Sequence, residues 1–283
     1  ARGTYEAEEM ALSDQVVRHG DRIIEFGSGI GLVTRHLARL TAGRRVLACE
    51  PNPAAAGVAR HHLAAAGLEV ALREALVVPA DGSGAGYAVD SDNFLASRTG
   101  RSGEGAEGGG TEGGGVATVT LPDLIAEWDP SCLVVDAEGA ELGLFRDQAL
   151  DRLRAVVIEM HPQVIGFEAT LDLAREFYRA GLVLVPDLIA GQTMVFVRPG
   201  TTDLALADTA TGRAAALRGM QLTLRAARAR AERRNAAALR FLTEAQGVLP
   251  GNAFVALDMA ITAGAGAGET GALLDLAAGS PAT

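Results

Sequence analysis

The sequence predicts an α/β protein with a doubly wound, Rossmann-like sheet of seven mostly parallel strands, a closing antiparallel hairpin and a helical C-terminal appendage. Short apolar runs alternate with amphipathic stretches from Arg22 to about Pro199, as in parallel sheets whose strands are joined by helices. The first run ends in a glycine turn at 27–31 and the second in Glu50, an arrangement typical of nucleoside-binding domains. Beyond Thr201 the composition becomes rich in Ala, Arg and Leu, which predicts helices.

The parallel strands are predicted from five apolar runs bounded by turn residues. They are 22–26, 46–50, 69–73, 132–136 and 155–160. A helix is predicted between Gly31 and Ala42, because Leu32, Val33, His36, Leu37 and Leu40 recur at helical spacing. Gly139 is expected to open another helix directly after the fourth strand.

A closing hairpin is predicted after a helix near 171–180. Its strands are 182–186 and 194–198, and the turn-like Ala190-Gly191-Gln192 lies between them. The segment 205–246 then predicts one or two helices, which Pro250 and Gly251 end. Two shorter helices are predicted at 253–263 and 268–278.

Two domains are therefore expected, a cofactor-binding domain at 1–200 and a helical appendage at 201–283. A Gly-rich insert at 99–115 contains no large apolar residue and is expected to be mobile. Two readings of this insert stay open. It is either a substrate lid near the ligand crevice or a surface insertion without function.

The composition excludes several classes of protein. A net charge of -10 argues against a dedicated nucleic-acid binder. No lysine occurs in the chain, which excludes a phosphate-binding P-loop. Cys49 and Cys132 lie in apolar runs and predict buried thiols in a reducing compartment. No metal-binding constellation, apolar signal core or membrane-length apolar run is present, so a cytoplasmic protein is expected.

Arginines are concentrated in the C-terminal appendage. They are Arg213, Arg218, Arg225, Arg228, Arg230, Arg233, Arg234 and Arg240. Two interpretations are open: a patch for an anionic partner, or an exposed helix face that forms ion pairs with the protein's own acids. The Ala and Leu content of the appendage also suggests a homodimer contact or docking of a partner.

The glycine turn distinguishes between nucleotide cofactors. A dinucleotide fingerprint G-x-G-x-x-G would place its third glycine at position 32, whereas here it is Gly31. Glu25 stands two residues before the first glycine. This E-x-G-x-G-x-G pattern resembles the S-adenosylmethionine-binding turn of class I methyltransferases. Glu50 follows Gly27 at close to the roughly 20 residues expected of a ribose-binding acid.

A second group of motifs lies downstream. The sequence reads VTLPDLI at 119–125, CLVVDAEGAE at 132–141 and VVIEMHP at 156–162. Together with the glycine turn, these motifs resemble the FkbM family of S-adenosylmethionine-dependent methyltransferases over about residues 4–199. Tyr5-Glu6 also stands where the family often has an aromatic-Glu pair.

The chain departs from the family pattern in its first turn. Glu25 replaces an Asp, Ser28 an Ala and Gly29 an Asn, so the carboxylate is kept but an amide is lost. Pro122 replaces an Asp of the second motif. The Gly-rich insert and the helical appendage have no counterpart in the family core.

The resemblance implies methyl transfer from S-adenosylmethionine to a hydroxyl on a small-molecule, sugar, lipid or polyketide-like acceptor. The implied cofactor-binding residues are Glu6, Glu25, Gly27, Ser28, Gly29, Gly31, Glu50, Pro51, Asn52, Glu74 and Asp136. Asp136, Glu138 and His161 are the candidate bases that remove the hydroxyl proton.

Other readings of these residues remain. Asp136 and Glu138 would serve equally as acids at a helix N-terminus, and Glu74 as a solvated acid at a strand end. For the whole chain, one rival is a nicotinamide-dependent oxidoreductase, which the glycine spacing disfavours. The other is a non-catalytic adapter that keeps the fold and binds a partner through its tail.

Overall fold

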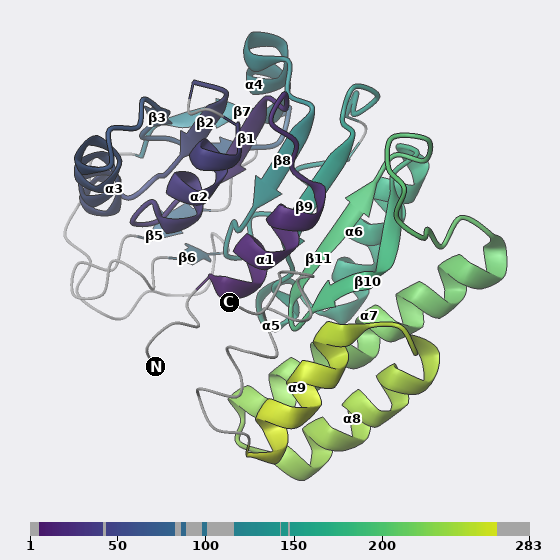
Figure 1. The fold of residues 1–283 in the computed structure, drawn as a ribbon. Coiled ribbons are helices and arrows are strands. Elements are labelled where there is room, and N and C mark those ends of the chain that lie inside the picture. The colour runs from purple at the N-terminus through teal and green to yellow at the C-terminus, as the bar shows by residue number, and fades with distance from the viewer. Residues whose placement is uncertain are drawn as a thin grey trace. The chain divides into compact units, whose positions relative to one another are not determined.

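The computed structural model of the chain consists of two compact units (Figure 1). The central unit comprises 18–152, and the terminal unit combines 1–17 with 153–283. The structure describes residues 6–41, 44–82, 86–88, 98–100, 116–141, 143–146 and 148–264.

The central unit contains four parallel strands in the order β8-β1-β2-β3. They are β1 (Ile23–Phe26), β2 (Val46–Cys49), β3 (Ala71–Arg73) and β8 (Cys132–Val135). Ile23 lies opposite both Val46 and Cys132. Every residue of β1, β2 and β8 is buried, which explains why their sequences are continuous apolar runs rather than alternating ones. Burial also raises the pKa of the Cys49 thiol to about 12, as expected for an unreactive cysteine.

Helices α2 (Leu32–Thr41), α3 (Pro53–Ala65) and α4 (Leu121–Trp128) connect strands of this unit. Val33, Leu37 and Ala38 form the buried face of α2. Asn52 caps α3 by accepting hydrogen bonds from Ala54 N–H at 2.9 Å and Ala55 N–H at 3.4 Å, and Pro53 follows at the first helical position, where its missing N–H costs nothing.

Two strand pairs outside the main sheet were not predicted. Strand β4 (Leu76–Val78) pairs in parallel with β7 (Thr118–Thr120). Strand β5 (Gly86–Ala88) pairs antiparallel with β6 (Arg98–Gly100). The first two residues of the predicted mobile insert are therefore in a strand, and the rest of that insert, 101–115, lies outside the described residues.

The terminal unit contains β9 (Ala155–Glu159), β10 (Val183–Ala190) and β11 (Thr193–Val197). Strand β11 pairs antiparallel with both neighbours, which confirms the predicted hairpin. Helix α1 (Ala7–Val16) packs on these strands (Figure 1), and Arg154 donates a hydrogen bond to Val16 O at 2.6 Å. Helices α5 (Pro162–Ile165) and α6 (Phe167–Arg179) follow β9.

The C-terminal helices α7 (Ala210–Ala231), α8 (Asn235–Val248) and α9 (Ala253–Ala263) lie side by side in Figure 1. Gly219 permits the close contact between α7 and α8, because a Cβ there would lie 2.3 Å from Leu249 Cδ1. Asn252 joins α9 to β10 by donating to Pro186 O at 2.8 Å and Ile189 O at 3.0 Å. The helix predicted at 268–278 lies outside the described residues.

The seven predicted strands are present: those of the central unit run parallel, and those of the terminal unit include the antiparallel hairpin. The predicted Rossmann-like α/β class with C-terminal helices is therefore confirmed. Among the helices of the described residues, none has the length and apolar character needed to cross a membrane.

The helix predicted directly after the fourth strand is wrong. In the described residues between Glu138 and Arg146 the chain forms turns instead. Glu138, Gly139 and Gly143 all have positive φ, at 48°, 100° and 78°, and residues in this left-handed region end a right-handed helix. Asp136 and Glu138 are consequently not the first acids of a helix.

Candidate active site

The glycine turn bends the chain from β1 over the carboxyl end of β2. Gly27 N–H and Ser28 N–H both donate to Cys49 O, at 2.9 and 3.2 Å, and Gly31 N–H donates to Ser28 O at 2.8 Å. Gly27, Gly29 and Gly31 have φ of 78°, 50° and 84°, which only glycine adopts readily. The turn therefore requires glycine at all three positions.

Gly27 brings the turn against the end of β8. Asp136 N–H donates to Phe26 O at 2.9 Å, and a Cβ on Gly27 would lie only 1.8 Å from Asp136 O. The contact leaves no room for any side chain at position 27. It also places the backbone of Asp136, a half-buried candidate for both cofactor binding and catalysis, beside the turn.

Glu50 is the polar centre of this arrangement. Its carboxylate accepts hydrogen bonds from Gly29 N–H and Asn52 N–H, both at 2.8 Å. Burial raises the pKa of the Glu50 carboxyl, and the two backbone hydrogen bonds oppose that rise. Glu50 thus joins the glycine turn to the start of α3, and Pro51 lies between Glu50 and the helix cap Asn52. Each carboxylate oxygen keeps a second lone pair for a ligand hydroxyl.

The remaining predicted residues of the central unit differ in their surroundings. Glu25 is 2% exposed on β1, opposite Ala48 and Val134. Glu138 follows Asp136 in a left-handed turn conformation. Glu74, expected to bind the cofactor, is exposed and forms an ion pair with Arg60 of α3. No described contact joins Glu74 to the glycine turn.

His62 supports the turn and was not predicted to do so. Its Nδ1 atom lies 2.9 Å from Ile30 O. Gly31 packs against the same helix, where an added Cβ would lie 3.0 Å from that of Ala59. No local signal marks His62 in the sequence, because the contact depends on how α3 packs.

The terminal unit carries Glu6 and His161. Glu6 precedes α1 with a φ of 55°. His161 is 3% exposed and precedes α5, and its Nε2 atom lies 3.9 Å from Glu159 Oε1. Gln192 fixes the intervening Met160 through two hydrogen bonds: Gln192 O accepts from Met160 N–H at 2.9 Å, and Gln192 Nε2 donates to Met160 O at 2.7 Å.

The sequence did not predict that Glu159 lies beside His161. The motif at 156–162 contains this acid. The alternating side-chain pattern of a strand, however, does not predict that the carboxylate of Glu159 lies close to the imidazole of His161. The proximity arises from the turn between the end of β9 and α5.

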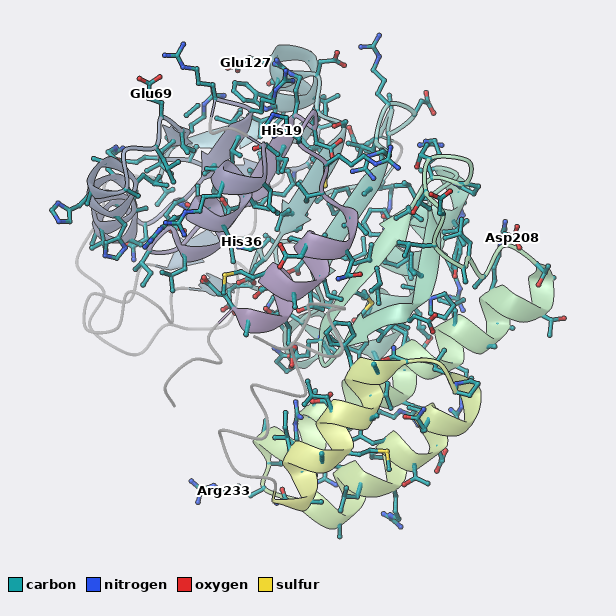
Figure 2. All side chains as sticks on the ribbon, in the orientation of Figure 1. His19, His36, Glu69, Glu127, Asp208 and Arg233 are labelled. Atoms are coloured by element: carbon teal, nitrogen blue, oxygen red, sulfur yellow. The ribbon has the colours of Figure 1, made fainter. Side chains whose placement is uncertain are left out.

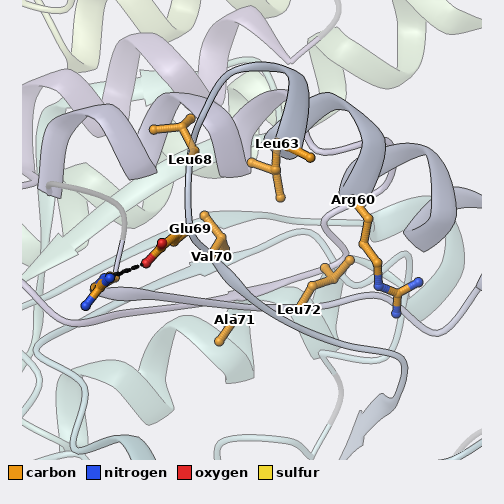
Figure 3. Close-up of a pocket in the computed structure, with 9 residues that line it drawn as sticks. Arg60, Leu63, Leu68, Glu69, Val70, Ala71 and Leu72 are labelled. Carbon is orange, nitrogen blue, oxygen red and sulfur yellow. Dashed lines mark hydrogen bonds and ion pairs between the residues drawn. The ribbon is translucent and has the colours of Figure 1, made fainter.

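A separate pocket of about 450 Å³ lies at the edge of the sheet (Figure 3). Leu63, Leu68, Val70 and Leu72 form its apolar lining, and Glu69 accepts a hydrogen bond from Arg44 at 2.6 Å beside it. Arg44 and Glu69 precede β2 and β3, whereas Glu50 follows β2. The pocket is therefore at the opposite end of the strands from the glycine turn.

Most arginines of the appendage have partners within the terminal unit. Ion pairs join Arg218 to Glu244, Arg228 and Arg234 to Glu232, and Arg230 to Asp258. Arg213 lies over the ring of Tyr178, and Arg225 over that of Phe167. Arg233, between α7 and α8, projects from the surface (Figure 2). These contacts favour the ion-pair interpretation of the arginines over a patch for an anionic partner.

The glycine turn fits the nucleoside cofactor predicted for it. Ser28 is 1% exposed, and in the described part of the chain its Oγ has no hydrogen-bond partner. A buried hydroxyl without a partner costs free energy that a polar ligand would recover. Glu50 would hold the ribose hydroxyls, and the Ser28 hydroxyl would bind a polar group of the cofactor.

Comparison with solved structures finds low sequence identities. A protein of the NADB-Rossmann superfamily from Streptococcus agalactiae is 12% identical, with a TM-score of 0.45 over 98% of each chain. The methyltransferase FkbM from Methylobacillus flagellatus KT is 14% identical, with a TM-score of 0.40, covering 64% of this chain and 44% of its own. An O-methyltransferase from Bacillus cereus, in complex with S-adenosylhomocysteine, is 15% identical, with a TM-score of 0.39 over 70% and 83%.

Among curated proteins, none matches the chain. The Methyltransferase FkbM domain matches residues 25–182. That range is more than half of the chain and includes the glycine turn, Glu50, Asp136, Glu138 and His161. The chain therefore belongs to the FkbM family of S-adenosylmethionine-dependent methyltransferases.

Proposed function

We propose that the protein is an O-methyltransferase that acts on a hydroxyl of a small-molecule, sugar, lipid or polyketide-like acceptor. The observation that carries the proposal is the glycine turn anchored by Glu50, with the buried hydroxyl of Ser28 inside it. When bound, S-adenosylmethionine supplies an electrophilic methyl group. The turn residues bind and orient that cofactor, and holding two reactants in place lowers a barrier by about 7 to 11 kcal/mol in favourable cases.

Transfer to a hydroxyl also requires a group that accepts its proton. We assign this role to His161, because the Glu159 carboxylate 3.9 Å from its Nε2 would stabilise the imidazolium that forms. The assignment leaves Asp136, whose backbone touches Gly27, to bind the cofactor beside the turn. Glu138 is the alternative base.

Calorimetry with S-adenosylmethionine and S-adenosylhomocysteine tests the cofactor site, with NADH as the control ligand. Micromolar binding of the first two and none of NADH is expected, with binding lost in Glu50→Ala. Absence of binding in a folded protein would overturn the enzyme function and favour the non-catalytic adapter.

Transfer of labelled methyl groups to hydroxyl-bearing acceptors then tests the reaction. Ser28→Ala is expected to weaken cofactor binding about tenfold, the loss of one hydrogen bond to a charged group. His161→Asn is expected to lower kcat by 10²-fold or more while cofactor affinity is kept. A greater loss of kcat in Glu138→Gln than in His161→Asn would reassign the base. Dimerisation through 201–283 remains a prediction, which mass in solution at micromolar concentration would test.

A further inference from the structure

Another pocket of the central unit lies at helices α2 and α3, which pack against each other (Figure 1). Its volume is about 250 Å³. Its lining consists of Arg35 from α2 with His61, His62, Ala65 and Ala66 from the end of α3. Among the described residues no acid lines it, although the chain has a net charge of -10. A pocket of this composition favours an anionic occupant.

The guanidinium of Arg35 has an unused hydrogen-bond donor. In the described part of the chain, its Nε atom is buried and has no hydrogen-bond partner. A buried donor without an acceptor costs free energy, which an acceptor that enters the pocket would recover. Arg60 of α3, by contrast, already forms an ion pair with Glu74.

Two imidazoles line the same pocket. His62 Nδ1 lies 2.9 Å from Ile30 O. A carbonyl only accepts hydrogen bonds, so Nδ1 donates to it and His62 Nε2 stays available for a ligand. His61 is exposed, and its ring centroid lies 6.4 Å from that of His62. Both residues lie near the C-terminal end of α3, where the helix dipole favours cations.

We propose that this pocket binds the phosphate group of a phosphate monoester. A guanidinium binds phosphate oxygens through paired N–H groups, and the two imidazoles can meet a third oxygen, which a carboxylate lacks. The volume is below the roughly 300–1,000 Å³ of pockets that enclose a drug-sized ligand. The pocket therefore takes one group, and the rest of the ester lies outside it, beside Ala65 and Ala66.

The pocket is a neighbour of the predicted cofactor site. None of its lining residues is among those predicted to bind the cofactor. His62 follows the α3 cap Asn52 by ten residues, which is about 15 Å along a helix. The pocket nevertheless borders the glycine turn, because Arg35 N–H donates to Gly31 O at 3.0 Å. The inference goes beyond the methyltransferase function and does not depend on it.

Calorimetry with glycerol 3-phosphate, inorganic phosphate and acetate tests the pocket. We expect saturable binding of the monoester at one site per chain, weaker binding of phosphate and none of acetate. Arg35→Gln is expected to weaken binding of the monoester about tenfold or more, the loss of a hydrogen bond between charged groups. Arg39→Gln removes the same charge from an exposed position one turn along α2. Because solvent screens that charge, this control is expected to keep the wild-type affinity.

Absence of saturable binding of the monoester, or equal weakening in the two arginine variants, would overturn the proposal. Tighter binding of inorganic phosphate than of the monoester would replace the ester by the free ion, and equal binding of acetate would refute a phosphate site. Saturating S-adenosylhomocysteine is expected to leave the affinity for the monoester unchanged. Competition between the two would show that the pocket belongs to the cofactor site.

Thermal unfolding guards against a variant that fails to fold. Without phosphate, Arg35→Gln is expected to melt as wild type does, because its Nε has no partner to lose. Saturating glycerol 3-phosphate is expected to raise the melting temperature of wild type but not of Arg35→Gln. In wild type, the ring NMR signals of His61 and His62 are expected to shift with the monoester, and unmoved signals would contradict the proposal.

The two proposals fail in different measurements. Failure of the methyltransferase function would appear as absent binding of S-adenosylmethionine, whereas failure of the phosphate pocket would appear as absent binding of glycerol 3-phosphate.

Discussion

The carboxylate of Glu50 accepts a hydrogen bond from the backbone N–H of Gly29 at 2.8 Å. The acid expected to bind the ribose therefore also fixes the shape of the glycine turn. Its second oxygen accepts a hydrogen bond from Asn52 N–H at the same distance. The Glu50 side chain therefore bonds both to the glycine turn and to the first residue of the α3 cap. Substitutions at Glu50 are expected to act on stability as well as on the cofactor.

Glu50→Gln places an amide NH₂ against one of these two backbone donors. Leaving a buried donor without an acceptor costs about 1–3 kcal/mol, so the free energy of unfolding is expected to fall by that amount. Urea denaturation measures it. Glu69→Gln, in which 71% of the original side chain is exposed, is the control, with an expected change below about 1 kcal/mol. Equal effects of both variants would show that Glu50 does not hold the turn.

Gly27→Ala is expected to abolish cofactor binding and destabilise the protein severely. The new Cβ would meet Asp136 O at 1.8 Å, at a φ of 78°, so β1 and β8 would have to separate. Gly67→Ala has a similar φ of 67° but nothing within 4 Å, and its expected cost is only the left-handed strain of about 1–2 kcal/mol. Thermal unfolding of both variants separates the effect of the clash at position 27 from that of the left-handed backbone. Similar losses of stability in the two variants would contradict the predicted clash.

Glu8 is expected to make stability depend on pH. Burial and the neighbouring Asp258 raise its pKa to about 7, against the opposing effect of Arg230. The folded protein then keeps a proton that the unfolded chain releases near pH 4.5. Stabilisation that is complete below pH 4.5 is consequently lost as the pH rises through about 7, by about 3 kcal/mol in total.

The comparison of wild type with Glu8→Gln measures this dependence. Glu8→Gln is expected to lack this component and to be the more stable protein at pH 8. Melting temperatures between pH 4.5 and 8 give both curves, and parallel curves would exclude Glu8 as the source.

Asn252→Ala is expected to loosen α9 from β10. The amide of Asn252 donates to Pro186 O and Ile189 O, and its oxygen accepts from Val255 N–H at 2.8 Å. Loss of the cap costs about 0.5–2 kcal/mol, and loss of donors to buried carbonyls about 1–3 kcal/mol. Hydrogen exchange in α9 is the direct measurement. Asn235→Ala, exposed at the start of α8, should leave exchange in α9 unchanged.

Much of the fold was predictable from the sequence because strands that are buried on both faces of a parallel sheet appear as continuous runs of apolar residues. The strands at 22–26, 46–50, 132–136 and 155–160 all occur, with ends displaced by a residue or two. The segment after Asp136 misled prediction because AEGAELG has helical composition, whereas Gly139 and Gly143 adopt left-handed backbone. Whether a glycine ends a helix depends on its φ, which composition does not specify.

The candidate site was predictable where one local segment forms it. The glycine turn and Glu50 are separated by one helix and one strand, so their spacing already implies proximity. Arg35 and His62 lie on different helices, and neither carries a local signal in the sequence. Only the packing of α2 against α3 reveals that they line one pocket. The family roles assigned to Glu6, Glu74 and Glu138 remain predictions.

The terminal unit is built from two segments that the whole central unit separates in the chain. During synthesis, the ribosome releases α1 before the central unit, and the partner strands of α1 only after the 135 residues of 18–152. Leu12 and Val16 are buried in the folded protein. At a synthesis rate of about 5–20 residues per second, their side chains remain exposed for many seconds before the strands that bury them are made. The central unit, by contrast, is continuous and can close as soon as it is made. Helix α1 is therefore exposed to chaperones and proteases for longer than the central unit is.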